Sequence, residues 1–193
     1  MYWSMRNRCA FILLLVSAIA GAQTGNEALS RAHPGSQAAA DLVRVAAGAD
    51  AAFLAAGLLK DASGELSGML QYPTDEIVVV TLKGSQLKAA LERSVANYPQ
   101  PNGAFLQISG MTVTFSESAS PESRILEVRV GDSALEPERQ YQVAMPATLA
   151  RGALGYFKIW DKTQISKNTG QTLASVLKGK TGAVRASRYT VKP

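Results

Sequence analysis

The sequence predicts a mixed α/β fold, of the α+β kind, in a single domain. The β-branched segment Ile77–Leu82 is apolar at almost every position, which is typical of a strand buried on both faces. Apolar residues at helical spacing follow it directly, from Leu87 to Val95. The second half of the chain instead carries a succession of strand patterns. Two alternations of helix and strand before a run of strands indicate this fold class.

In the first half, helices and strands are expected to alternate. Ser36 can cap a helix that runs to about Ala47, and Ala51–Ala55 is a short apolar run with the length of a buried strand. The glycine-rich connection after that run has room for one short helix. The helix that follows the β-branched segment is expected to run from Ser85 to about Asn97.

The second half is expected to hold four strands and one helix. Alternation of apolar and polar residues over Phe105–Ser116 predicts one continuous strand. Further strands are expected at Ile125–Val130 and Tyr141–Met145, with a final strand over 183–191. A short helix is expected at Thr172–Leu177.

The first 22 residues are typical of a secretory signal peptide. Arg6 and Arg8 form a positively charged start, and the apolar run that follows is shorter than the roughly 20 residues that span a bilayer. Ala20-Gly21-Ala22 fits a small-residue cleavage site. Residues 23–35 are expected to form a flexible lead-in, which leaves 36–193 as the domain. We therefore expect a periplasmic or secreted protein with no membrane attachment after cleavage.

Composition excludes several kinds of site. Cys9 is the only cysteine and lies inside the predicted signal, so a cleaved chain has no disulfide, no thiolate nucleophile and no cysteine-based zinc site. Removal of Arg6 and Arg8 leaves 18 basic and 15 acidic side chains, a net charge of +3. This weak excess comes without a basic cluster interleaved with aromatic residues, which argues against nucleic acid as a partner.

Residues able to run hydrolytic chemistry are missing from the sequence. His33 is the only histidine, and its place in the lead-in predicts an exposed loop residue rather than a base or a metal ligand. One histidine cannot supply a Ser-His-Asp triad or a dinuclear metal site of the usual histidine and carboxylate kind. The loop Gly152–Gly155 lacks the lysine of a Walker phosphate loop. We expect no catalytic residue, no metal site and no cofactor bound by this chain.

The order of several motifs resembles a known family. The segment Ile77–Leu82 is followed by Lys-Gly-Ser-Gln-Leu, and the next motif is Gly103-Ala-Phe-Leu-Gln-Ile-Ser-Gly110. Together with Ala49–Lys60, Tyr72-Pro73, Tyr141–Pro146 and Gly152–Tyr156, this order resembles the C-terminal, substrate-binding domain of the 5'-nucleotidase family over about residues 36–180. The resemblance implies mixed sheets covered by helices. It also implies that hydrolysis belongs to a separate metallophosphatase domain, which holds two metal ions.

The resemblance assigns ligand contacts to three residues of this sequence. Lys60 stands at the position of an arginine, and Lys83 at that of a lysine or arginine, that face the substrate phosphate. Phe105 stands at the position of a phenylalanine that stacks on the base. Each residue also has an ordinary interpretation, because exposed lysines are usually solvated and an aromatic residue at a strand position usually packs in the core.

Other positions depart from the family pattern. Ala55 and Leu58 replace an asparagine and a glycine of the first loop, Thr148 replaces a second stacking phenylalanine, and Leu154 replaces the acid that binds ribose hydroxyls. Lysine also keeps the charge of arginine without its bidentate geometry. Each lost contact to base or ribose weakens binding by roughly 1–3 kcal/mol, so nucleotide or nucleoside binding is expected to be weak.

Three functions remain open on this reasoning. The first is a nucleotide- or nucleoside-binding subunit that acts in nucleotide catabolism with a separately encoded metallophosphatase, which would carry the divalent metals. The second is a binding or scaffold module that no longer recognises nucleotides. The third, an independent hydrolase, is disfavoured by the missing histidines.

Overall fold

The structure, a computed structural model, describes residues 27–60 and 64–193, so the expected signal peptide over 1–22 lies outside the described residues. The strands are β1 (Ala51–Ala55), β2 (Glu76–Lys83), β3 (Leu106–Ser109), β4 (Met111–Ser116), β5 (Ile125–Val130), β6 (Ser133–Ala134), β7 (Gln140–Pro146), β8 (Ile165–Thr172) and β9 (Tyr189–Lys192). The α-helices are α1 (Pro34–Ala47), α2 (Gly84–Val95), α3 (Ala147–Ala150) and α4 (Leu173–Leu177). Short 3-10 helices are η1 (Glu27–Leu29), η2 (Ala56–Leu58), η3 (Leu66–Met69), η4 (Ala153–Lys158) and η5 (Lys162–Gln164).

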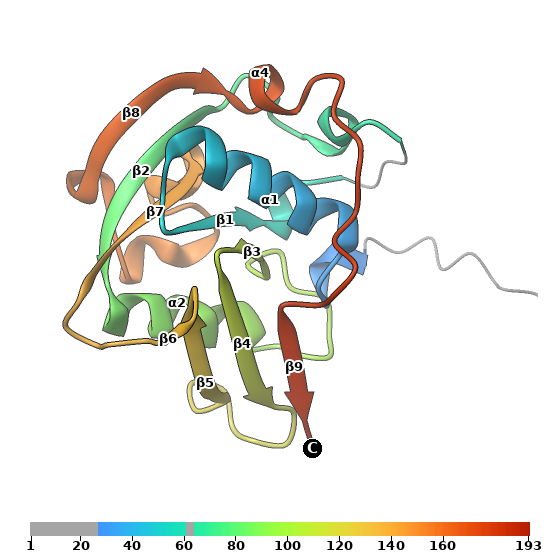
Figure 1. Cartoon of the computed structure of the whole chain (residues 1–193). Coiled ribbons are helices and arrows are strands. Elements are labelled where there is room, and N and C mark those ends of the chain that lie inside the picture. The colour runs from blue at the N-terminus through green and yellow to red at the C-terminus, as the bar shows by residue number, and fades with distance from the viewer. Residues whose placement is uncertain (1–26, 61–63) are drawn as a thin grey trace, which may run out of the picture.

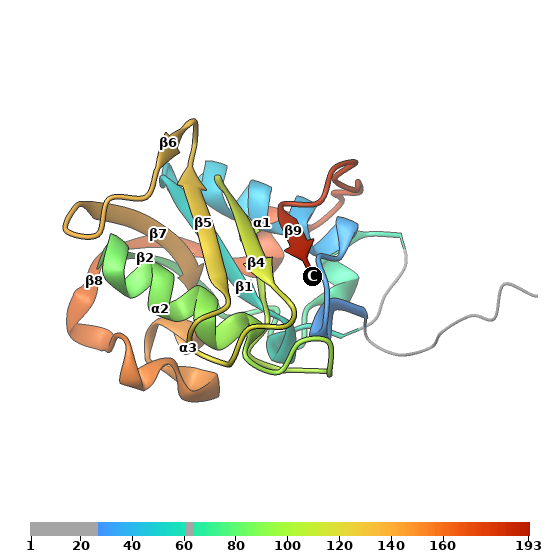
Figure 2. The same ribbon diagram turned by 90° about the horizontal axis from the view of Figure 1, so that it is seen from below.

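Two sheets organise the fold, as the mixed α/β class predicts (Figures 1 and 2). The larger sheet has the strand order β3-β1-β7-β2-β8, and the smaller has the order β6-β5-β4-β9. In the larger sheet β1 and β7 are parallel, whereas β2 runs antiparallel to β7 and β3 runs antiparallel to β1. The sheet is therefore mixed, and its strands do not all end at the same edge.

Both faces of the larger sheet are buried. Phe53 and Val80 point into one apolar cluster, and their neighbours Leu54 and Val79 point into the other. This alternation explains why the β1 and β2 sequences are apolar at nearly every position, since neither face meets water. No helix of the described residues is long and apolar enough to cross a bilayer.

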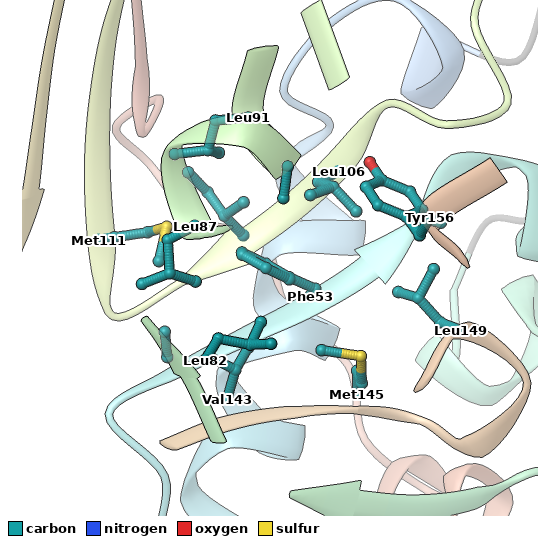
Figure 3. Close-up of a cluster of buried hydrophobic side chains, with 14 of the residues drawn as sticks. Phe53, Leu82, Leu87, Leu91, Leu106, Met111, Val143, Met145, Leu149 and Tyr156 are labelled. Carbon is teal, nitrogen blue, oxygen red and sulfur yellow. The ribbon is translucent and has the colours of Figure 1, made fainter. Parts of the chain in front are cut away.

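Each face of the larger sheet has its own cover. Helices α1 and α4 cover one face, and α2 with the smaller sheet covers the other. Figure 3 shows Phe53 at the centre of the apolar cluster between the larger sheet and α2. Leu87 and Leu91 of α2 approach Phe53 from one side, and Tyr156 of η4 approaches it from another. The core thus joins both sheets and the segment after β7 into one packed unit.

The expected single strand over Phe105–Ser116 is wrong, because the chain forms two strands there that belong to different sheets. The break lies at Gly110, whose φ of 75° only glycine adopts at little cost. A side chain at this position would also collide with the carbonyl oxygen of Asp50. The sequence alternation continues across the break because both strands bury one face, so alternation alone does not reveal the corner.

Three further strands differ from expectation. The two-residue strand β6 was not predicted. Strand β8 was not predicted, because Ile165–Thr172 is polar and lies at the sheet edge, where it pairs only with β2. The final strand begins at Tyr189 rather than at residue 183. The expected helices near the middle and the C-terminus are confirmed as α2 and α4, and their ends differ from the prediction by about two residues or fewer.

The described part of the expected lead-in, residues 27–35, packs against the domain. Ala28 is buried, and the amide of Gln107 donates hydrogen bonds to the carbonyl oxygens of Ala28 and Arg31, at 3.0 and 2.8 Å. His33 is half-buried and caps α1, because its Nδ1 accepts from the backbone N–H of Ser36 at 3.2 Å. The expectations of a flexible segment and of an exposed histidine are therefore wrong for these residues.

Two polar contacts, one buried and one half-buried, tie peripheral elements to the core. The Glu92 carboxylate on α2 accepts from the backbone N–H groups of Arg124 and Ile125, at 2.8 and 3.1 Å, which ties α2 to β5. Nη2 of the Arg188 guanidinium donates to both oxygens of the Asp41 carboxylate, at 2.8 and 2.7 Å, which ties the segment before β9 to α1. The hydrogen bonds to Glu92 offset part of the cost of burying its carboxylate.

The corner at Gly110 gives the first prediction. Gly110→Ala should lower the free energy of unfolding by about 3 kcal/mol or more, because it adds a left-handed backbone penalty and a backbone collision. The matched control is Gly170→Ala, with a φ of 70° and open space around the site, which should cost only about 1–2 kcal/mol. Urea unfolding followed by circular dichroism measures both. Equal losses in the two variants would contradict the packing argument.

Candidate ligand-binding site

The carboxyl ends of β1 and β7 lie side by side because the two strands are parallel. Beyond them come η2 with Lys60 on one side and α3 with η4 on the other. Strand β2 is antiparallel to β7, so its first residue and the turn before it, together residues 72–76, lie at the same edge. We call this region, made of residues 56–60, 72–76, 102–105 and 147–155, the β1–β7 edge. Ligands of α/β proteins bind preferentially at the carboxyl ends of parallel strands.

Backbone segments approach closely at the β1–β7 edge. The N–H of Gly57 donates to the carbonyl oxygen of Gly103 at 2.8 Å, and a Cβ on Gly57 would lie 3.0 Å from the same oxygen. Leu58 and Leu154 are half-buried there and pack against the apolar cluster. The positions at which the resemblance expects a glycine and a hydroxyl-binding acid therefore present aliphatic surface.

The loop around Leu154 is held by α2. The Arg93 guanidinium donates through Nε, at 3.0 Å, and through Nη2 to the carbonyl oxygen of Leu154. Its central carbon also lies 5.5 Å from the centre of the Tyr156 ring, within the range of a cation–π contact. Leu154 itself has a φ of 57°, an uncommon value for a residue with a side chain. Arg93 thus fixes the backbone that carries Leu154.

Phe105 lies in the core. Its side chain is 2% exposed, and its ring centre lies 5.0 Å from that of Tyr189. The hydroxyls of Tyr156 and Tyr189 donate to the carbonyl oxygens of Ala104 and Leu106, at 2.6 and 2.8 Å, and so fix the backbone on both sides of Phe105. Burial raises the pKa of both tyrosines well above the usual value, so both hydroxyls stay protonated as donors. Stacking of a base on Phe105 stays a prediction, and the ring has no exposed face that would support it.

The two lysines expected to face phosphate are at opposite ends of the sheet. Lys60 is exposed beyond the carboxyl end of β1. Lys83 ends the antiparallel strand β2 where it enters α2 (Figure 1). Its Nζ pairs with Glu138 at 2.8 Å. The length of β2, roughly 20 Å, separates that end from the β1–β7 edge. One phosphate group cannot contact both side chains, and only Lys60 belongs to the β1–β7 edge.

Two residues that sequence reasoning missed line an open depression at the β1–β7 edge. Tyr72 is 48% exposed, Arg151 is also exposed, and both share the depression with Thr148. The position of Arg151 directly before the glycine loop could have marked it, but no pattern predicts that Tyr72 faces outward. In the part of the chain that the structure describes, no group of three or more His, Cys, Asp or Glu side chains could hold a metal ion.

Comparisons with known proteins identify proteins that this chain is similar to. A family model described as "5'-nucleotidase, C-terminal domain" matches residues 20–162. The 5'-nucleotidase of Bos taurus is 33% identical over 109 residues, which are 52% of this chain and 19% of the bovine protein. The snake venom 5'-nucleotidase of Macrovipera lebetinus is 37% identical over 86 residues, 40% of this chain and 21% of that protein.

A solved structure shows the same fold. The crystal structure of the 5'-nucleotidase precursor from Thermus thermophilus superposes with a TM-score of 0.73 at 23% sequence identity. The superposition covers 87% of this chain and 37% of that chain. The present chain therefore spans well under half the length of the proteins it resembles.

The position of Phe105 gives the second prediction. Phe105→Ala should lower the free energy of unfolding by about 3–5 kcal/mol, because it leaves a cavity in a closed core. Phe157→Ala removes a side chain that is 65% exposed and should change stability by no more than about 0.5 kcal/mol. Urea unfolding compares the two variants. A loss below about 1 kcal/mol in Phe105→Ala would show that the ring is free to meet a ligand.

Proposed function

Because the chain belongs to the 5'-nucleotidase C-terminal domain family, we propose that it is a nucleotide- or nucleoside-binding subunit that works with a separately encoded metallophosphatase. In this proposal the partner supplies the divalent metals and the hydrolytic site, and this chain holds the ligand. The observation that carries the proposal is the exposed Lys60 just beyond β1, at an edge where parallel strands end and ligands commonly bind.

The division of labour rests on the residues that the sequence contains. The chain has one histidine, and His33 uses its Nδ1 to cap α1. Activation of water by a pair of metal ions needs several histidine and carboxylate ligands held together. At the β1–β7 edge the chain instead offers two cationic groups, Lys60 and Arg151, that can contact a ligand phosphate. The Asp75 and Glu76 carboxylates share the depression with Arg151, whereas Lys60 is not among the residues that line it.

We also propose export to the periplasm or the exterior, on the signal-like pattern of residues 1–22. Cleavage after Ala22 would make Gln23 the first residue of the mature protein. N-terminal sequencing of the protein recovered from its native compartment tests this, and an intact Met1 would contradict it.

A mixing experiment tests the proposed subunit. Phosphate release from AMP and from a UDP-sugar is measured with Mg²⁺ or Mn²⁺, using this chain, a metallophosphatase from the same organism, and both together. Turnover should appear, or rise by about tenfold or more, only in the mixture. Lys60→Ala should then lower kcat/KM by about tenfold or more, because it removes a charge-assisted phosphate contact. The control is Lys88→Ala, which removes an exposed lysine of α2 and should change little.

Other results of the mixing experiment would contradict the proposal. Chelator-sensitive turnover by the pure chain would make it a hydrolase in its own right. A loss in Lys83→Ala but not in Lys60→Ala would place the phosphate at the opposite end of the sheet.

The second candidate function is a binding or scaffold module that no longer recognises nucleotides. It is favoured by the aliphatic side chains of Leu58 and Leu154 at the β1–β7 edge and by the burial of Phe105. Calorimetry with AMP, adenosine and UDP-glucose up to millimolar concentration separates the two candidates. Absence of heat with all three ligands would favour the scaffold module.

A further inference from the structure

An exposed aromatic ring stands at the β1–β7 edge and has no role in the core. Tyr72 is 48% exposed, whereas Phe105, the ring expected to meet a base, is 2% exposed. Tyr72 is the aromatic residue among the side chains that line the depression with Thr148 and Arg151. A ligand with a flat aromatic group therefore finds one accessible ring face there.

The turn that carries Tyr72 is fixed by the elements around it. The N–H of Gln71 donates to the carbonyl oxygen of Leu58 at 3.3 Å, which places Tyr72 beside η2. The N–H groups of Leu173 and Ala174, at the start of α4, donate to the carbonyl oxygens of Asp75 and Pro73, at 2.9 and 2.8 Å. A ring on a fixed turn loses less conformational freedom when it meets a ligand than a ring on a mobile loop.

The depression holds two carboxylates, Asp75 and Glu76, and one guanidinium, that of Arg151, which is its cationic hydrogen-bond donor. The Asp75 carboxylate accepts from the backbone N–H of Thr148, at 3.2 Å for its closer oxygen, and the Glu76 carboxylate accepts from the amide of Asn168 at 2.9 Å. Both acids thus have partners, whereas the Arg151 side chain makes no ion pair with any described residue. A guanidinium beside an exposed ring suits the acceptor-rich edge of a nucleobase.

We propose that Tyr72 is the residue on which the base of a nucleoside or nucleotide stacks, with Arg151 donating to an acceptor on that base. The inference rests on the proposed function and names the base-contacting part of the same site. It assigns specificity to the turn before β2 rather than to Phe105.

The test titrates AMP and ribose 5-phosphate into the wild type and into Tyr72→Ala, Tyr72→Phe, Arg151→Gln and Phe157→Ala, by calorimetry or NMR chemical-shift mapping. AMP should bind Tyr72→Ala about 10- to 100-fold more weakly than the wild type, since a base loses its stacking partner. Arg151→Gln should also weaken AMP binding. Ribose 5-phosphate, which has no base, should bind Tyr72→Ala and the wild type equally.

Tyr72→Phe keeps the ring and should bind AMP as the wild type does. Phe157→Ala removes an exposed ring outside the depression and is the matched control. The inference is overturned if Tyr72→Ala binds AMP as tightly as the wild type, a result that leaves the proposed function standing. A wild type that binds neither AMP nor ribose 5-phosphate overturns both the inference and the proposed nucleotide binding. A wild type that binds ribose 5-phosphate and AMP equally overturns the inference alone.

Discussion

Two-sided burial of the larger sheet is the constraint on which the rest of the molecule depends. All five residues of β1 are buried, and successive side chains enter different apolar clusters. A shift of β1 by one residue would exchange the two sets of side chains and misplace Phe53, which packs between the sheet and α2. The register is therefore strongly specified, and with it the position at which β1 and β7 end. The packing of the core therefore fixes the position of the candidate site independently of the residues that line the site.

The same core also removes side chains from the site. Phe105 is held inside because two tyrosine hydroxyls bind the carbonyl groups on either side of it and because its ring packs on Tyr189. Leu58 and Leu154 extend the apolar packing to the surface of the edge. Polar and aromatic groups that can meet a ligand come instead from turns, where exposure is not limited by packing. Fold and ligand contacts can for this reason diverge at different rates in one family, since each depends on different positions.

Sequence patterns predicted the parts of the fold that burial dictates. The apolar runs of β1, β2 and β7 and the helical spacing of α2 gave these elements to within a few residues, because each must present apolar groups at fixed intervals. Strand β8 was not predicted because an edge strand that faces solvent needs no regular spacing of apolar residues. The corner at Gly110 was not predicted because the alternation of apolar and polar residues continues through it. Lys60 was expected just past the carboxyl end of a strand, where the structure has it. The exposure of Tyr72 and the burial of Phe105 depend on neighbours distant in sequence.

Strand direction explains why the two lysines predicted to face phosphate lie too far apart to contact one phosphate group. In a mixed sheet a residue after one strand and a residue after its antiparallel neighbour lie at opposite edges, and the sequence states only that each follows a strand. In the proposed function a ligand phosphate would meet a single exposed lysine in water, where two unit charges 4 Å apart attract by only about 1 kcal/mol. At an effective dielectric constant near 20, typical of a partly covered surface, the same pair attracts by about 4 kcal/mol. The affinity of the β1–β7 edge for an anion should therefore depend on what covers that edge. A partner that closes over Lys60 would strengthen binding without contributing any contact of its own.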